Sequence, residues 1–271
     1  MQDSERRKAE QARRPYPDAD DLVTVIAIAV LASIVQNVLH EGCGHGLAAY
    51  LSGAHTITLS TVAENSEINS RWIDAAGTLV NLVAGAVFWI LLRARSYAPE
   101  MRLFLLLAMM GNLFSGTGYF LFSGIAGFGD WEAVTRGWSP AWAWRVGLIV
   151  VGVASYFGAM RIVAAEYRPF VRGHTPRRIR RLAWVPYGAD GVLALFAGLL
   201  NPLGLFYVVA SALPATLGAN AGLWSMPGMA RAGGEGDGVG WIRRSWPWIA
   251  VGTVIALVFT FVLGRSVTWK R

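Results

Sequence analysis

Six long apolar runs without a charged side chain dominate the pattern of the chain. They cover residues 22–39, 75–92, 103–128, 146–160, 192–229 and 249–263. Each is about 15 residues or longer, and most approach the ~20 residues that an α-helix needs to cross a ~30 Å hydrocarbon core. The pattern predicts an all-α polytopic membrane protein with about six transmembrane helices, for which the lipid bilayer is the surrounding medium.

Two segments depart from this helical pattern. Residues 55–62 alternate and are rich in β-branched side chains, which predicts a short strand or hairpin after the first helix. Residues 184–222 are too long for one span and short for two, and Asn201-Pro202 interrupts them where a helix should break. One broken helix and two short helices are both compatible with this segment.

The charge distribution predicts the orientation of the chain. Only 15% of the residues are charged, against roughly 25% in a soluble domain. Five Lys and Arg residues lie in the first 21 residues and six in 165–182, whereas only Arg71 lies between the first two spans. Basic blocks beside apolar spans are typical of orientation signals, so we expect a cytoplasmic amino terminus and no nucleic-acid partner despite the net charge of +7.

These features divide the chain into three parts. Residues 1–21 form a polar tail, 22–135 a three-helix core, and 136–271 the additional transmembrane helices. The last part is predicted to contain a basic loop over 165–182 and a Gly-rich loop over 231–240. No charged residue lies within 192–229, so no ion site is expected there.

The first apolar run ends in a group of ionisable residues, His40-Glu41-Gly42-Cys43-Gly44-His45. Ionisable side chains inside a membrane segment are costly and usually mark a functional site. The order His-Glu-…-His is similar to the zinc hydrolase signature, in which two histidines bind the metal and the glutamate is the general base. That signature has two residues between the glutamate and the second histidine, whereas this chain has three.

The extra residue allows two arrangements. In a regular α-helix, His40 and His45 would diverge by about 140°. A π-bulge at Gly42–Gly44 would bring them together, because it adds one residue to a turn and glycine tolerates unusual backbone. Both histidines would then be ligands and Glu41 the general base. Alternatively, Glu41 and His45 share a face without distortion and are both ligands, which leaves His40 a supporting or catalytic role.

A third ligand should come from another span at the same membrane depth. Asp130 follows the third apolar run, which is predicted to end on the same side as the first, and the glycines before it allow the backbone to bend inward. Asp74, at the start of the second run, is the alternative ligand. Asn81 and Asn112 are expected to supply supporting polar contacts between helices. This donor set predicts one bound zinc ion, at a site nearer the extracytoplasmic side.

Several motifs together resemble the site-2 protease family of intramembrane zinc metalloproteases. Residues 40–49 are similar to that family's first motif, HExGHxxAA, with one residue inserted, and Gly77 to Asn81 is similar to its Gly-x-x-x-Asn motif. Asn112 and Asp130 are similar to the asparagine and the aspartate ligand of its third core helix. The resemblance covers residues 22–135. It implies hydrolysis of peptide bonds in membrane protein or peptide substrates, with residues 55–62 as a strand able to pair with the substrate.

The chain also departs from the family's pattern. Besides the inserted residue, Asp130 lies 18 residues after Asn112, farther than in the family, and Thr78 stands where the family has proline. These departures leave a second function open, that of a catalytically inactive membrane scaffold or regulatory pseudoprotease. The break at Asn201-Pro202 leaves a third, that of a transporter.

Overall fold

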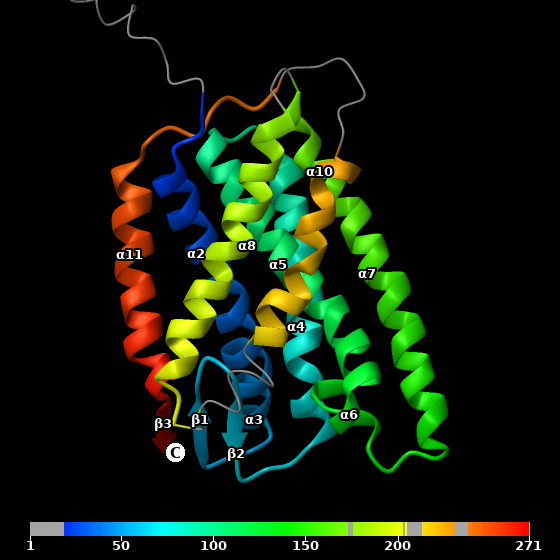
Figure 1. The fold of residues 1–271 in the computed structure, drawn as a ribbon. Helices are drawn as coiled ribbons and strands as arrows, with labels where there is room; N and C mark the ends of the chain where they lie inside the picture. The colour runs from blue at the N-terminus through cyan, green and yellow to red at the C-terminus, as the bar shows by residue number, and fades with distance from the viewer. Residues whose placement is uncertain (1–18, 173–175, 203, 205–212, 231–237, 271) are drawn as a thin grey trace, which may run out of the picture.

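The computed structural model of the protein describes residues 19–172, 176–202, 204, 213–230 and 238–270. Within this part of the chain, six helical spans are long and apolar enough to cross a membrane, which confirms the predicted all-α polytopic class (Figure 1). The first span is continuous but changes its helical type along its length. The spans are formed by α2 (Leu22–Val38) with π-helix η1 (Leu39–Gly46) and α3 (Leu47–Leu51), then α4 (Arg71–Ala94), α5 (Pro99–Ala126), α7 (Ala141–Val171), α8 (Pro176–Leu199) and α11 (Trp246–Phe261) with the 3₁₀ turn η5 (Leu263–Arg265).

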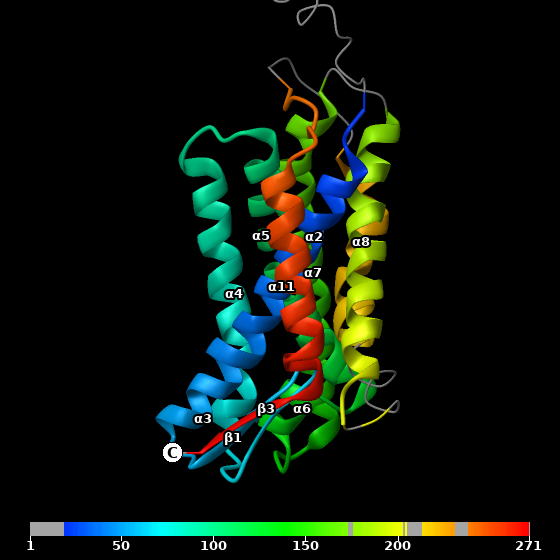
Figure 2. The same ribbon diagram turned by 90° about the vertical axis from the view of Figure 1, so that its left-hand side faces the viewer.

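A small antiparallel sheet covers one end of the helix bundle, beside α3 and the short helix α6 (Asp130–Thr135). The predicted strand is confirmed as a hairpin of β1 (Thr56–Leu59) and β2 (Glu64–Ser66). A third strand, β3 (Val267–Lys270), pairs with the other edge of β1, so the strand order is β2-β1-β3 (Figure 2). β1 therefore has no open edge, and the expected pairing of a substrate with this strand is not possible while β2 and β3 are in place.

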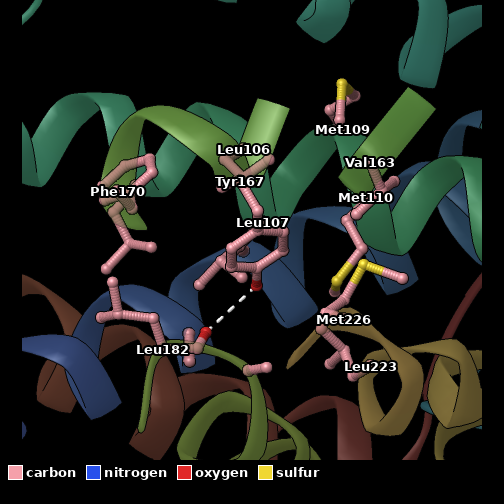
Figure 3. Packing of buried hydrophobic residues seen from close by; sticks show 14 of the residues in the cluster. Leu106, Leu107, Met109, Met110, Val163, Tyr167, Phe170, Leu182, Leu223 and Met226 are labelled. Atoms are coloured by element: carbon pink, nitrogen blue, oxygen red, sulfur yellow. Dashed lines mark hydrogen bonds between the residues drawn. The ribbon is translucent and has the colours of Figure 1, made fainter. Parts of the chain in front are cut away.

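Helix α5 is the centre of the bundle. In its most apolar 18-residue stretch, 72% of the residues are buried inside the protein. The corresponding share is 22% for α7 and 17% for the last span, so most apolar residues of these two helices are left to face lipid. Buried side chains of α5 pack against α7, α8 and the short helix α10 (Met226–Met229). Figure 3 shows part of this core, in which the Tyr167 hydroxyl of α7 donates a 3.0 Å hydrogen bond to the Leu182 carbonyl of α8.

The prediction of a basic loop over 165–182 is wrong for most of this segment, which is helical. Helix α7 continues to Val171 and α8 begins at Pro176, so most of the basic residues lie on helix ends. Arg178 is buried, and its guanidinium donates two hydrogen bonds to the Asp20 carboxylate at 2.9 and 2.8 Å. A span defined by the absence of charge ends at its first arginine, whereas the helix itself continues because arginine is a good helix former.

The long apolar stretch 192–229 is divided as the Asn201-Pro202 pair predicted. Helix α8 ends at Leu199, just before this pair. After residues 205–212, which lie outside the described part, the chain forms the π-helix η3 (Pro214–Gly218), the 3₁₀ helix η4 (Ala219–Ser225) and α10. Most of the predicted Gly-rich loop 231–240 and of the polar tail 1–21 also lies outside the described residues.

Candidate metal centre

The π-helix η1 places His40 and His45 on the same side of the first span. A π-helix forms its hydrogen bonds from i to i+5, so residues five apart lie one above the other, as residues four apart do in an α-helix. The two Nε2 atoms are 3.2 Å apart. The predicted distortion around Gly42–Gly44 is therefore confirmed, and it removes the divergence that a regular helix would impose.

Two glycines allow α4 to pass directly against this turn. A Cβ on Gly44 would collide with the backbone of Gly77 in α4. A Cβ on Gly77 would in turn collide with His45 Nε2 and lie 2.8 Å from His40 Cε1. No side chain larger than hydrogen fits at either position without a shift, so the glycine pair sets how closely the histidines approach α4.

Asp130 is brought to the histidines by a sharp turn after α5. Gly127 and Gly129 adopt φ values of 64° and 102°, a region that favours glycine, and the chain reverses direction into α6. The Asp130 Oδ2 atom lies 3.4 Å from His40 Nε2 and 3.5 Å from His45 Nε2. Burial raises the pKa of the Asp130 carboxyl, but the two histidines lower it more strongly and hold it below its ordinary value.

The three donor atoms fit a zinc ion. Their mutual separations are 3.2, 3.4 and 3.5 Å. Tetrahedral zinc bound at ~2.0–2.1 Å holds its ligand atoms about 3.4 Å apart, and catalytic sites use three protein ligands and keep the fourth position open. Two imidazoles and a carboxylate are also a donor set that zinc accepts. Of the described residues, His40, His45 and Asp130 are the group suited to hold a metal ion.

A chain of amide hydrogen bonds determines the tautomer of His40. The Asn112 side-chain amide donates to the Ala108 carbonyl at 2.8 Å, so its oxygen is left to accept from Asn81 Nδ2 at 2.7 Å. The Asn81 oxygen then faces His40 Nδ1 at 2.5 Å and can only accept. His40 Nδ1 therefore carries the proton, and its Nε2 lone pair points to the other two ligands. Both asparagines have the supporting role predicted for them.

His45 is oriented in the same way by the backbone. Its Nδ1 atom lies 2.7 Å from the Ile73 carbonyl in α4, which accepts its proton and leaves Nε2 free to bind a metal. Thr78 donates its hydroxyl proton to Asp130 Oδ2 at 3.2 Å. Tyr119 stacks on the His40 ring, with the centroids 4.8 Å apart and the planes 22° apart. Each of the three candidate ligands is thus held by a neighbour outside the group of three.

The donor atoms border a cavity of about 180 Å³. Glu41 lines this cavity, is buried, and has an oxygen, Oε2, without a hydrogen-bond partner among the described residues. Because Asp130 and not Glu41 completes the group of three, the arrangement with both histidines as ligands is favoured over the one with Glu41 and His45. Asp74 also lines the cavity, from the first turn of α4, but it lies outside the group of three.

Two cavity residues have no signal in the sequence. Glu64 reaches the cavity from β2, and burial raises the pKa of its carboxyl. Tyr119 reaches it from α5 in the middle of an apolar run. Both lie at the cavity only because the hairpin folds over η1 and α5 packs beside it, and neither event is encoded in a local spacing.

The fold and the site thus define a multi-pass membrane protein in which two buried histidines and one half-buried aspartate form a group that could hold a metal ion. Comparison with protein-family models, curated proteins and solved structures finds no match for this chain. The resemblance to site-2 proteases therefore remains an expectation from the sequence motifs.

Proposed function

We propose that the protein is an intramembrane zinc metalloprotease that hydrolyses peptide bonds of membrane-embedded substrates. The observation that carries this proposal is the set of three donor atoms 3.2 to 3.5 Å apart, beside the unpartnered Glu41 carboxylate in the same cavity. When bound, zinc supplies Lewis-acid polarisation of the scissile carbonyl and lowers the pKa of water towards ~7.

The protein residues divide the remaining tasks. His40, His45 and Asp130 hold the zinc ion, and Asn81 and the Ile73 carbonyl keep both imidazoles in the metal-binding tautomer. Glu41 is the general base. Its buried carboxylate oxygen has no donor of its own, so it is able to accept a proton from water and pass it to the leaving amine.

The substrate segment must be extended before it can react, because the backbone groups of a membrane helix are already bonded internally. Residues 62–64, which connect β1 to β2 and begin β2, line the cavity. β1 is paired on both sides, whereas β2 is an edge strand of the sheet. We therefore assign β2, and not β1, as the strand to which an extended substrate adds.

The membrane orientation follows from the basic residues. With the amino terminus in the cytoplasm, the end of the bundle that carries the sheet and α6 faces the extracytoplasmic side. The cavity is at this end, since α6 and β2 both line it. The peptide bond would accordingly be cleaved near the outer membrane surface.

Zinc content and proteolysis test the proposal separately. The full chain, purified in detergent, is expected to hold one zinc ion, and His45→Ala is expected to lose it. His55→Ala is the matched control, because His55 is exposed and lies outside the group of three. Stoichiometric zinc in His45→Ala would refute the ligand assignment.

The base assignment is tested with Glu41→Gln on a labelled transmembrane peptide. This variant is expected to retain zinc and lose cleavage, whereas Glu100→Gln, at the start of α5, should retain both. Cleavage by Glu41→Gln at the wild-type rate would refute the role of Glu41. A wild-type protein that binds zinc but cleaves no membrane peptide would instead be an inactive scaffold.

A further inference from the structure

A second buried carboxylate lies in the helix bundle, apart from the metal-binding group. Asp190, in the middle of α8, is 4% exposed. The Asn220 amide of η4 donates to Asp190 Oδ2 at 3.1 Å, and the Ser33 side chain of α2 lies near the same carboxylate. The zinc site and its supporting hydrogen bonds use none of these three residues, which come from three separate elements.

Two oxygen atoms of this cluster lack a partner. Asp190 Oδ1 and Asn220 Oδ1 have no hydrogen bond to any described residue, and Asn220 is itself only 5% exposed. An ionised carboxylate oxygen and an amide oxygen both accept only, so they cannot satisfy each other. Leaving such acceptors unpaired in a buried place is costly. A ligand that carries positive charge would satisfy both oxygen atoms.

Asp190 forms no salt bridge within the described part of the chain. Of the elements that pack against α8, α2, α11, η3, η4 and α10 contain no charged residue. The other two, α7 and η5, carry arginines, but none of these forms an ion pair with Asp190. The arginines of α8 itself end at Arg181, nine positions or about 14 Å before Asp190. An ionised Asp190 would therefore leave a single negative charge uncompensated among apolar helices, where it is expensive.

The backbone beside Asp190 is irregular in a way that suits ion binding. Asn220 lies in a 3₁₀ helix that follows a π-helix, and both contact α8. Tyr156 of α7 holds this segment, because its hydroxyl donates to the Ala219 carbonyl at 2.5 Å and accepts from the Gly222 amide at 2.9 Å. A stretch of 3₁₀ or π geometry inside a helix often marks a functional position.

We propose that Asp190, Asn220 and Ser33 form a binding site for a small monovalent cation, sodium. The donors are carboxylate, amide and hydroxyl oxygens, which favour a hard cation over a transition metal. One negative charge balances one positive charge, whereas a divalent ion would leave an excess charge buried. No ion site was expected in residues 192–229 because this range contains no charged residue. Asp190 lies two positions before the range, and Asn220 lies inside it.

Sodium-dependent stability tests this site without reference to proteolysis. The full chain in detergent is heated in NaCl or in choline chloride at equal ionic strength. The wild-type Tm is expected to rise with NaCl in a saturable way, since a ligand that binds only the folded state stabilises it. Asp190→Asn should lose the response, and Asn220→Ala should shift its midpoint about tenfold higher, the effect of ~1.4 kcal/mol of lost binding free energy.

Two control variants separate this site from other carboxylates and from the zinc site. Glu166→Gln removes a carboxylate of α7 that is already partnered by Trp89, at 3.0 Å, and it should keep the sodium response. His45→Ala should keep it too, because the cluster shares no residue with the metal-binding group. If Asp190→Asn does not fold, the sodium site is tested on the folded wild-type protein instead. Radioactive sodium is expected to bind to it and to be displaced by unlabelled NaCl.

A wild-type Tm equal in NaCl and choline chloride, together with no displaceable sodium, would overturn the proposal. A sodium response retained by Asp190→Asn would overturn it as well. Stabilisation of the wild type by acid alone, with no sodium effect, would mean that Asp190 holds a proton in place of the ion.

Discussion

Replacing Gly77 with alanine tests the geometry of the metal site most directly. The added Cβ would collide with His45 Nε2 and lie 2.8 Å from His40 Cε1. Neither ring is free to swing away, because Asn81 holds His40 and the Ile73 carbonyl holds His45 through their Nδ1 atoms. The methyl group must therefore either displace a ring and break a buried hydrogen bond, or push α4 away from η1.

The expected loss of zinc affinity in Gly77→Ala follows from the cost of these two routes. Overpacking a tight contact costs about 1–3 kcal/mol, and losing one buried hydrogen bond costs a further ~1 kcal/mol. Every 1.4 kcal/mol lost from binding corresponds to a tenfold weaker affinity. We therefore expect Gly77→Ala to bind zinc about 10- to 100-fold more weakly than the wild type, the range seen when groups that orient metal ligands are altered.

Zinc affinity is measured by competition with a chelator of known strength, alongside the Tm of each protein without metal. Gly85→Ala is the matched control. Its Cβ would meet the Leu113 side chain at 2.7 Å, so it strains the contact between α4 and α5 but touches no ligand. Gly85→Ala should lower the Tm and leave zinc affinity unchanged. Wild-type zinc affinity in Gly77→Ala, or an equal loss in both variants, would refute the reasoning.

Three further predictions concern the support of the site and the ends of the helices. Asn81→Ala should weaken zinc binding about 10- to 100-fold in the same chelator assay, because it frees the His40 tautomer. Asp21 caps α2 by accepting from the Thr24 amide, so Asp21→Ala should lower the free energy of unfolding by about 1 kcal/mol at neutral pH. Burial raises the pKa of the Asp21 carboxyl, but its hydrogen bonds lower it more, to below the ordinary 3.8. The free energy of unfolding of the wild type should therefore exceed that of Asp21→Ala above pH 3.8, and this difference should disappear on further acidification. Arg178→Met should cost about 3–5 kcal/mol in denaturant unfolding, since it leaves the Asp20 charge buried and unpaired.

Each of these predictions has a comparison that isolates its cause. Arg180→Met removes an exposed charge from the same helix turn and should change the free energy of unfolding by less than about 0.5 kcal/mol. For Asp21→Ala, a difference from the wild type that persists at the lowest accessible pH would show that the carboxylate is not its origin. Undiminished zinc affinity in Asn81→Ala would argue against the hydrogen-bond chain as the support of His40.

The transmembrane helices were readable from the sequence because lipid imposes a local requirement. A spanning segment must be apolar along its whole length and must bond its own backbone, so each span is visible in its own residues. The same reasoning failed at the end of α7 and over most of α8, where helix continues through the arginines of 165–182. The apolar run 192–229 covers only the last eight residues of α8. Charge marks where the chain leaves the apolar region, not where the helix ends.

The metal-binding group was predictable for a different reason. Histidines and a glutamate are expensive near the membrane interior, so His40, Glu41 and His45 stood out by residue type. Asp130 was preferred to Asp74 because of its position after the third apolar run. The spacing of five between the histidines was ambiguous, since it requires a π-helix and allows a competing arrangement. The contact of Gly44 with Gly77, a residue 33 positions away, accompanies the π-helix in the folded protein.

The sequence by itself thus determined the class of the protein, the approximate number of its spans and most of the residues at its candidate metal site. Only the tertiary structure decided that β3 closes the open edge of β1, that Glu64 and Tyr119 line the cavity, and that Asp190 meets Asn220. The physical reason is the range of the interactions. Transfer from water to lipid acts on each residue separately, whereas these contacts depend on how segments about 20 or more positions apart pack together.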